Sequence, residues 1–183
     1  NANVRNSKFN KNWVRNSGIY QIDEGGGAIT VTHKLSVDHC EFTENTGLKG
    51  GAIIAIYEQS SDLVPSNYVT ITASLFERNV AFDGGAICSN YNMTVDKSVF
   101  NQNIATGYGG GAINSGYKSN DNYFKNSIFF NNTADNYGGA LATSHSHIRN
   151  CTFEYNKARH GGAIFSLSFD IANSTLHDNV ATV

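Results

Sequence analysis

Residues 148–164 read IRNCTFEYNKARHGGAI and hold one complete copy of a unit that recurs along the chain. The unit consists of an apolar residue, then Ser or Cys, then Phe, Asn and Ala, and after a short gap Gly-Gly-Ala-Ile. In this copy the first five of these are Ile148, Cys151, Phe153, Asn156 and Ala158. The Phe recurs three residues before an Asn at Phe9, Phe42, Phe76, Phe100, Phe129 and Phe153, with Leu176 in a seventh copy. The Gly-Gly-Ala triplet begins at Gly26, Gly50, Gly84, Gly110, Gly138 and Gly161. An internal repeat of this length is typical of a solenoid.

The spacing of the repeat predicts the kind of solenoid. Consecutive aromatic positions are 33, 34, 24, 29, 24 and 23 residues apart, so the shortest period is 23–24 residues and some copies carry insertions. Ser or Cys precedes each aromatic by two residues, which is the period of a strand, and no segment keeps a helical period with caps. Equivalent residues of successive turns then stack about 4.8 Å apart. We therefore predict an all-β fold, a right-handed single-stranded parallel β-helix of about 6–7 turns of 23–34 residues, forming one domain over residues 1–183.

This fold gives each residue of the unit a role. We expect the Phe column to stack as the core, and the Asn after it to sit at a left-handed corner and hydrogen-bond to its copy in the next turn. Gly-Gly is expected to turn the chain where a Cβ would clash, and Ala-Ile to re-enter the core. The 24 Asn and 18 Gly of the chain suit such corners.

Composition excludes several classes of protein. Thirteen Lys and Arg against fifteen Asp and Glu give a net charge of −2, which excludes a nucleic-acid binder that uses a broad basic surface. No apolar run reaches the roughly 18 residues of a transmembrane helix, so no transmembrane segment is predicted. Cys40 and Cys151 hold one offset four turns apart, about 19 Å, which is too far for a disulfide. We predict three buried free thiols, no metal site and no cofactor.

Gly-Gly-Ala-Ile or Leu alternating with Phe-x-x-Asn resembles the repeat of chlamydial polymorphic outer membrane proteins, and of adhesin-like surface proteins of methanogenic archaea. The resemblance covers Val4 to Ala181. It implies a surface-exposed β-helix passenger or stalk, extracellular and associated with an outer membrane or cell wall, usually linked to adhesion and not to catalysis. Because both ends lie in mid-unit, we expect the chain to be part of a longer surface protein, with end-to-end self-association as the alternative.

Aromatic side chains supply the candidate ligand site. Five residues after the Ala of each Gly-Gly-Ala stand His33, Tyr57, Tyr91, Tyr117 and His145. If the register holds, the tyrosines stack on consecutive turns with histidines beside them, and such a column suits a surface glycan or a protein receptor. The alternative is an aromatic ladder that only stabilises the solenoid. Polar insertions at 15–24 and 58–67 are expected to leave the solenoid as lateral loops.

An enzyme of the same fold is the rival hypothesis. A polysaccharide lyase or hydrolase needs convergent catalytic groups, and a glycosidase needs two carboxylates at about 5–9 Å. The two positions after each Phe give no pair of carboxylates on neighbouring turns, and Glu44 beside Arg78 is predicted to be a surface ion pair. We therefore predict an adhesin-like or structural stalk or envelope protein with no catalytic residues, and keep a carbohydrate-active enzyme as the alternative.

Four Asn-x-Ser/Thr sequons make glycosylation a further prediction. They begin at Asn92, Asn131, Asn150 and Asn173. Because Asn150 and Asn173 hold an offset shared with other asparagines, where the side chain is expected to stack, Asn92 and Asn131 are the better candidates.

Overall fold

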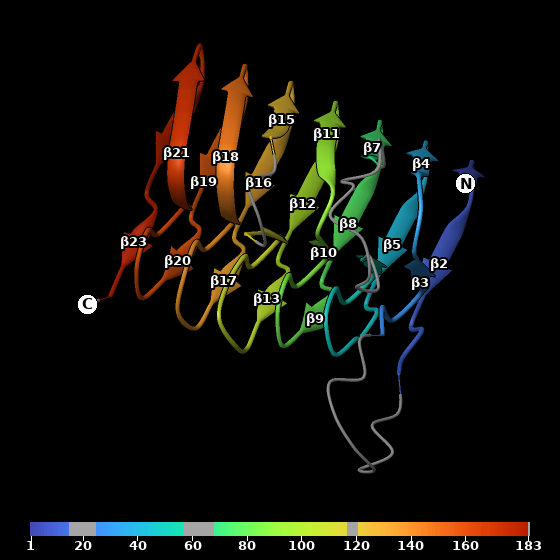
Figure 1. Ribbon diagram of the computed structural model, residues 1–183. Coiled ribbons are helices and arrows are strands. Elements are labelled where there is room, and N and C mark those ends of the chain that lie inside the picture. The colour runs from blue at the N-terminus through green and yellow to red at the C-terminus, as the bar shows by residue number, and fades with distance from the viewer. Residues whose placement is uncertain (15–24, 57–67, 117–120, 183) are drawn as a thin grey trace, which may run out of the picture.

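The protein is a stack of parallel β-turns about one axis. The computed structural model describes residues 1–14, 25–56, 68–116 and 121–182, and in Figure 1 the successive turns lie side by side with the two termini at opposite ends. Each turn contributes strands to three sheets, and every strand pair in the described part of the chain is parallel. The predicted parallel β-helix is therefore confirmed.

The Phe-containing strands form the second sheet and the Ala-containing strands form the third. The second sheet consists of β2 (Lys8–Asn10), β5 (Glu41–Thr43), β8 (Leu75–Glu77), β12 (Val99–Asn101), β16 (Ile128–Phe130), β19 (Thr152–Glu154) and β22 (Thr175–His177). The third consists of β9 (Val80–Ala81), β13 (Ile104–Ala105), β17 (Thr133–Ala134), β20 (Lys157–Ala158) and β23 (Val180–Ala181).

The first sheet is the longest, and the insertions divide it. After Gly-Gly-Ala it contains β3 (Ile29–Val31), β6 (Ile53–Ala55), β10 (Ile87–Ser89) and β14 (Ile113–Ser115). Before the Phe strand it contains β1 (Ala2–Arg5), β4 (Leu35–Asp38), β7 (Tyr68–Thr72), β11 (Asn92–Asp96) and β15 (Asp121–Lys125). In the last two turns the halves merge into β18 (Leu141–Arg149) and β21 (Ile164–Ala172), and β18 pairs with both β14 and β15. The insertion at 15–24 falls between β2 and β3 along the chain and that at 58–67 between β6 and β7, and both lie outside the described residues.

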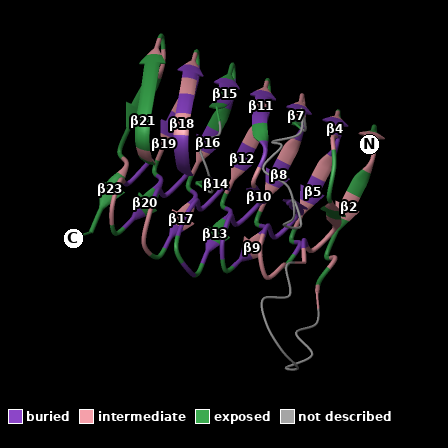
Figure 2. Ribbon diagram, viewed as in Figure 1, coloured by how far each residue is buried: buried purple, intermediate pink, exposed green. Residues whose placement is uncertain are grey.

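A continuous phenylalanine stack forms the core. Phe42, Phe76, Phe100, Phe129 and Phe153 are fully buried, and the centroids of neighbouring rings from Phe9 to Phe153 are 4.7–5.0 Å apart with nearly parallel ring planes. This spacing is that of the strands, so ring stacking and backbone pairing share one repeat. Figure 2 shows the buried residues running through the central turns, whereas β21 and β23 are largely exposed.

The asparagine after each Phe forms a second internal ladder, and its predicted place at a corner is wrong. The side-chain Nδ2 of each donates to Oδ1 of the next at 2.8–3.0 Å, along Asn12, Asn45, Asn79, Asn103, Asn132, Asn156 and Asn179. The left-handed residue is the one before it, with φ of 50–56° at Lys11, Glu44, Arg78, Gln102, Asn131, Tyr155 and Asp178. Because that residue bends the chain, the Asn turns inward and its amide joins successive turns.

The Gly-Gly corner behaves as predicted. Gly84 has a φ of +61°, in the left-handed region that favours glycine. A Cβ on Gly85 would lie 2.1 Å from the carbonyl oxygen of Gly111, so no larger residue fits without moving the neighbouring turn. The residues that follow, Ala86 and Ile87, are fully buried and re-enter the core.

The three cysteines are buried free thiols, as predicted. Burial is the main cause that raises the pKa of the Cys151 thiol, and the thiolate is the reactive form. We expect Cys40, Cys88 and Cys151 to resist alkylation by iodoacetamide at pH 8 in the folded chain and all to react in denaturant. Intact mass before and after unfolding measures this, and stoichiometric labelling of the folded chain would contradict the burial.

Candidate functional site

An aromatic hollow opens on the outside of the solenoid, beside the Gly-Gly corner of its later turns. Its volume is about 430 Å³. It is lined by Tyr108, Gly109, Asn114, Gly116, Tyr137, Ala142, Thr143, Phe165 and Leu167. Volumes of this order are typical of small-ligand sites, which are mostly apolar with a few polar groups.

Gly109 stands at the edge of the hollow, in a column of residues that pair from turn to turn. The residues directly before the Gly-Gly pairs align between turns, and in this column Gly109 pairs with Tyr137, which pairs with His160. The column therefore carries no side chain on the turn before Tyr137. A Cβ at Gly109 would lie 2.8 Å from the carbonyl oxygen of Tyr137 and 3.0 Å from Cβ of Ala142, so the next turn packs closely against Gly109 and alanine would not fit there without a shift.

Aromatic rings make the walls. The Tyr137 ring stacks on His160 with centroids 5.3 Å apart, and it contacts the Phe165 ring at 4.5 Å with a tilt of 40°. Tyr108 is 64% exposed and meets Phe82 edge to face at 6.0 Å. Leu167, 79% exposed, completes the apolar rim. Large apolar side chains are thus left open to solvent around one hollow, which is where a binding partner gains most by covering them.

The floor comes from the strands after Gly-Gly-Ala. Asn114, Ala142 and Phe165 are in register on β14, β18 and β21. The small side chain of Ala142 therefore lies between the Asn114 amide and the Phe165 ring. Behind the wall, the buried carboxylate of Asp83 accepts hydrogen bonds from the backbone N–H of Tyr108 at 2.8 Å and of Gly109 at 3.3 Å. These bonds fix the backbone that carries the Tyr108 ring.

Few polar groups line the hollow, and none of its described lining residues is charged. Asn114 Oδ1 accepts a hydrogen bond from Gly116 N at 3.1 Å, while its Nδ2 has no partner among the described residues. The Tyr108 and Tyr137 hydroxyls likewise make no hydrogen bond within the described part of the chain. Thr143 Oγ1 and Ser146 Oγ form a hydrogen bond of 2.7 Å with each other. The described lining therefore offers an amide donor and phenol groups to a ligand, without an acid or base among these residues.

Sequence comparison identifies the repeat that builds this hollow. The family model described as the Chlamydia polymorphic membrane protein repeat matches residues 126–144 and 150–167. These two segments carry the chlamydial polymorphic membrane protein repeat. No curated protein and no solved structure matches the chain. The two matched copies contain Tyr137, Ala142, Thr143, Phe165 and Leu167, so most of the hollow lies within them. The polymorphic membrane protein repeat is that of a surface or outer membrane protein family.

The predicted tyrosine column is not open to a ligand at Tyr91. This ring is only 5% exposed, and its hydroxyl lies 2.6 Å from the carbonyl oxygen of Thr32 and 3.0 Å from that of Ile56, where it donates inward. Tyr57 and Tyr117, the other members of the column, lie outside the described residues.

The two predicted histidines do not extend such a column either. His145 is half-buried and in register with Asp121 and Ser168, not with the residue five after Ala112. Counting from Gly-Gly-Ala crosses the insertion between β14 and β15, so the assumed register is lost there. His33 is exposed, with Nδ1 3.1 Å from Thr32 Oγ1.

The signal for the hollow was present in the sequence, one or two residues before Gly-Gly. Those offsets carry Phe82, Tyr108, Tyr137 and His160, and Gly109 interrupts the column. Offsets after the triplet are disturbed by insertions, whereas those before it keep their register from turn to turn.

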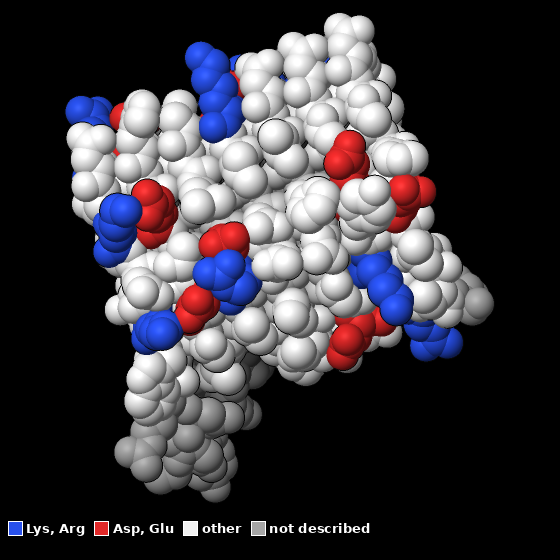
Figure 3. Space-filling model, turned by 180° about the vertical axis from the view of Figure 1, so that it is seen from behind, with Lys and Arg blue, Asp and Glu red and all other residues white. Residues whose placement is uncertain are grey.

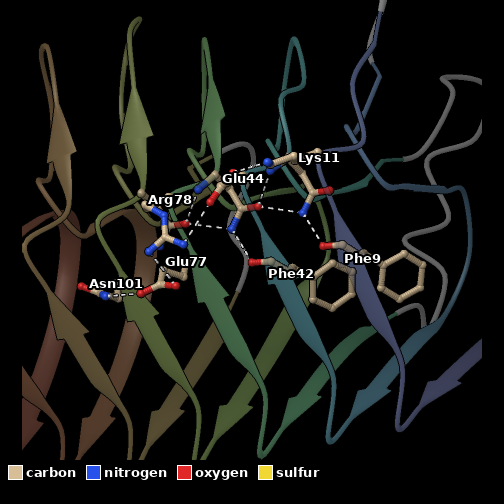
Figure 4. A network of polar contacts seen from close by, with 10 residues as sticks. Phe9, Lys11, Phe42, Glu44, Glu77, Arg78 and Asn101 are labelled. Carbon is tan, nitrogen blue, oxygen red and sulfur yellow. Dashed lines mark hydrogen bonds and ion pairs between the residues drawn. The ribbon is translucent and has the colours of Figure 1, made fainter.

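Charged side chains at the corners of the solenoid form ion pairs with one another, and these pairs do not build a binding or catalytic site among the described residues. The predicted ion pair between Glu44 and Arg78 is confirmed at 3.1 Å, and Figure 4 shows it in a row with Lys11, Glu77 and Asn101 across successive turns. The hydrogen bond from Arg78, helped by Lys11, lowers the pKa of Glu44. On the face in Figure 3, Lys and Arg lie beside Asp and Glu on a mostly uncharged surface. Within the described residues, no three His, Cys, Asp or Glu side chains gather as metal ligands.

The described ranges contain no helix that is long and apolar enough to cross a bilayer.

Both glycosylation candidates are exposed. Asn92 lies on β11 and Asn131 at a corner of the solenoid. Asn131 makes no side-chain hydrogen bond to a described residue, whereas Asn150 Nδ2 donates to Asn126 Oδ1 at 3.1 Å. Intact-mass measurement on native material tests whether Asn92 and Asn131 are modified.

Proposed function

We propose that this chain is an extracellular, adhesin-like β-helix of the cell surface, which mediates attachment through the aromatic hollow. The observation that carries this proposal is the hollow itself, in which Tyr108 and Phe165 are exposed, Tyr137 is half-buried and no described lining residue is charged. Open aromatic rings on a rigid scaffold are the side chains that dominate binding energy at contact surfaces. The polymorphic membrane protein repeat supports the placement at the surface.

The same observation favours binding over catalysis. A polysaccharide hydrolase needs an acid and a base or nucleophile at the sugar, and a lyase needs a base. Among the residues that the structure describes, the lining of the hollow contains no Asp, Glu, His, Lys or Arg. We therefore assign the chain to the binding and structural proteins, with a surface glycan or a protein receptor as its partner.

Bead adhesion tests the proposal. The full chain, coupled through a C-terminal tag to fluorescent beads, is expected to hold them on plates coated with neutral polysaccharide or with gelatin under flow. Beads that carry serum albumin are the control. Equal retention of both kinds of beads, or release of new reducing or unsaturated ends from the polysaccharide by the chain, would overturn the proposal.

A further inference from the structure

We infer that the hollow beside Gly109 binds one ring of a neutral sugar, stacked on Tyr137, within the glycan of a surface partner. This inference rests on the proposed function and narrows its partner to one chemical class. The volume of about 430 Å³ lies near the lower end of the range for ligand sites, roughly 300–1,000 Å³. It suits one or two sugar rings, whereas docking of a folded protein needs about 800 Å² on each partner.

The Tyr137 ring has a side that no column residue covers. His160, on the following turn, stacks against the ring at 5.3 Å with an interplanar angle of 23°. On the preceding turn the equivalent residue is Gly109, which has no side chain to place against the ring. An aromatic face carries partial negative charge, and the C–H groups on one face of a pyranose carry partial positive charge. A sugar ring in the hollow would contact the Tyr137 ring, which lines it.

The polar groups match the hydroxyls at the edge of a sugar ring. Asn114 Nδ2 is a donor without a partner among the described residues, and the phenols of Tyr108 and Tyr137 can donate or accept. An apolar protein side chain in the hollow would cover these groups without pairing them, at a cost in free energy. A sugar both covers the rings and pairs the polar edge, so the geometry favours a glycan over a peptide.

The lack of charge defines the class of sugar. Sialic acids, uronic acids and sugar phosphates carry an anion, and proteins bind such anions with Arg or Lys. None of the nine described residues that line the hollow is charged. The expected ligand is therefore a neutral hexose or an N-acetylhexosamine.

Two substitutions in the hollow and one outside it test the inference. Tyr137→Ala removes the stacking ring. Gly116→Leu fills the hollow, since the described atoms nearest to a Cβ there would be Asn114 Oδ1 at 3.4 Å and Ala142 O at 4.0 Å, both at ordinary contact distance. Tyr155→Ala is the matched control, because Tyr155 is an exposed tyrosine that packs on Phe130 of the second sheet, away from the lining residues.

Binding is measured by saturation-transfer difference and ¹H–¹⁵N NMR on the full chain. The probes are methyl glycosides of glucose, galactose, mannose and N-acetylglucosamine and their di- to tetrasaccharides. We expect at least one neutral probe to bind with a Kd of about 1 mM and to shift the amide signals of Gly109 and Gly116. Tyr137→Ala and Gly116→Leu should each weaken it by about tenfold, and Tyr155→Ala by less than about twofold.

The outcomes separate this inference from the proposed function. If no neutral probe shifts Gly109 or Gly116, or if Tyr155→Ala weakens binding as much as Tyr137→Ala, the inference is wrong. If beads adhere only to gelatin and Gly116→Leu releases them, the proposed function stands and the occupant is a protein, which also overturns the inference. If neutral probes bind in the hollow but beads do not adhere, the inference stands and the attachment function fails.

Discussion

Replacing Phe100 by alanine is expected to lower the free energy of unfolding by about 3–5 kcal/mol, the usual cost of removing a buried phenylalanine. Phe100 is fully buried, with Phe76 at 4.8 Å on one face and Phe129 at 5.0 Å on the other. Its loss leaves a cavity between two rings that the strand spacing holds apart. Because β8, β12 and β16 fix that spacing by backbone pairing, the neighbours cannot collapse into the gap.

Denaturant unfolding followed by circular dichroism measures this effect. Ile128→Ala is the control, because Ile128 lies on the neighbouring strand β16, is 44% exposed and faces outward beside the buried Phe129. It should cost less than about 1 kcal/mol. Similar losses for Phe100→Ala and Ile128→Ala would mean that the phenylalanine stack is not the main source of stability.

Much of the fold could be predicted because each repeat carries its own corners. The Gly-Gly pair at Gly84 and Gly85 and the phenylalanine stack behave as the repeat indicates, since a column of equal residues forces equal environments in every turn. The corner beside Asn79 was misplaced by one residue. Both Arg78 and Asn79 tolerate a turn, and only the inward amide ladder decides which of them bends the chain.

The candidate site was harder to predict, because it depends on a deviation from the repeat. The hollow lies where Gly109 interrupts the column before Tyr137 and where Ala142 is small. No single copy contains this information. The prediction that Tyr91 belongs to a ligand site was wrong because an aromatic residue at a repeated offset is also typical of a binding surface. In the structure the Tyr91 hydroxyl instead hydrogen-bonds to backbone carbonyl groups.

The asparagine ladder yields the second large expected effect. Asn103 Oδ1 accepts hydrogen bonds from the backbone N and the side-chain Nδ2 of Asn79, both at 3.0 Å. Its own Nδ2 donates to Phe76 O and to Asn132 Oδ1, again at 3.0 Å. Asn103→Ala leaves both donors of Asn79 without their acceptor in a fully buried position. Since each unsatisfied buried group costs about 1–3 kcal/mol, we expect a loss of about 3–5 kcal/mol.

Two further variants separate hydrogen bonding from packing in this ladder. Asn103→Leu keeps most of the side-chain volume but has no hydrogen-bonding atom, so it should be about as destabilising as Asn103→Ala. Asn10→Ala should change stability by less than about 0.5 kcal/mol, because Asn10 is exposed on β2 and makes no side-chain hydrogen bond to a described residue. If Asn103→Leu unfolds at the same denaturant concentration as the unsubstituted chain, then space filling and not amide pairing joins these turns. A loss in both Asn103 variants with Asn10→Ala unchanged would assign the stability to the buried amides.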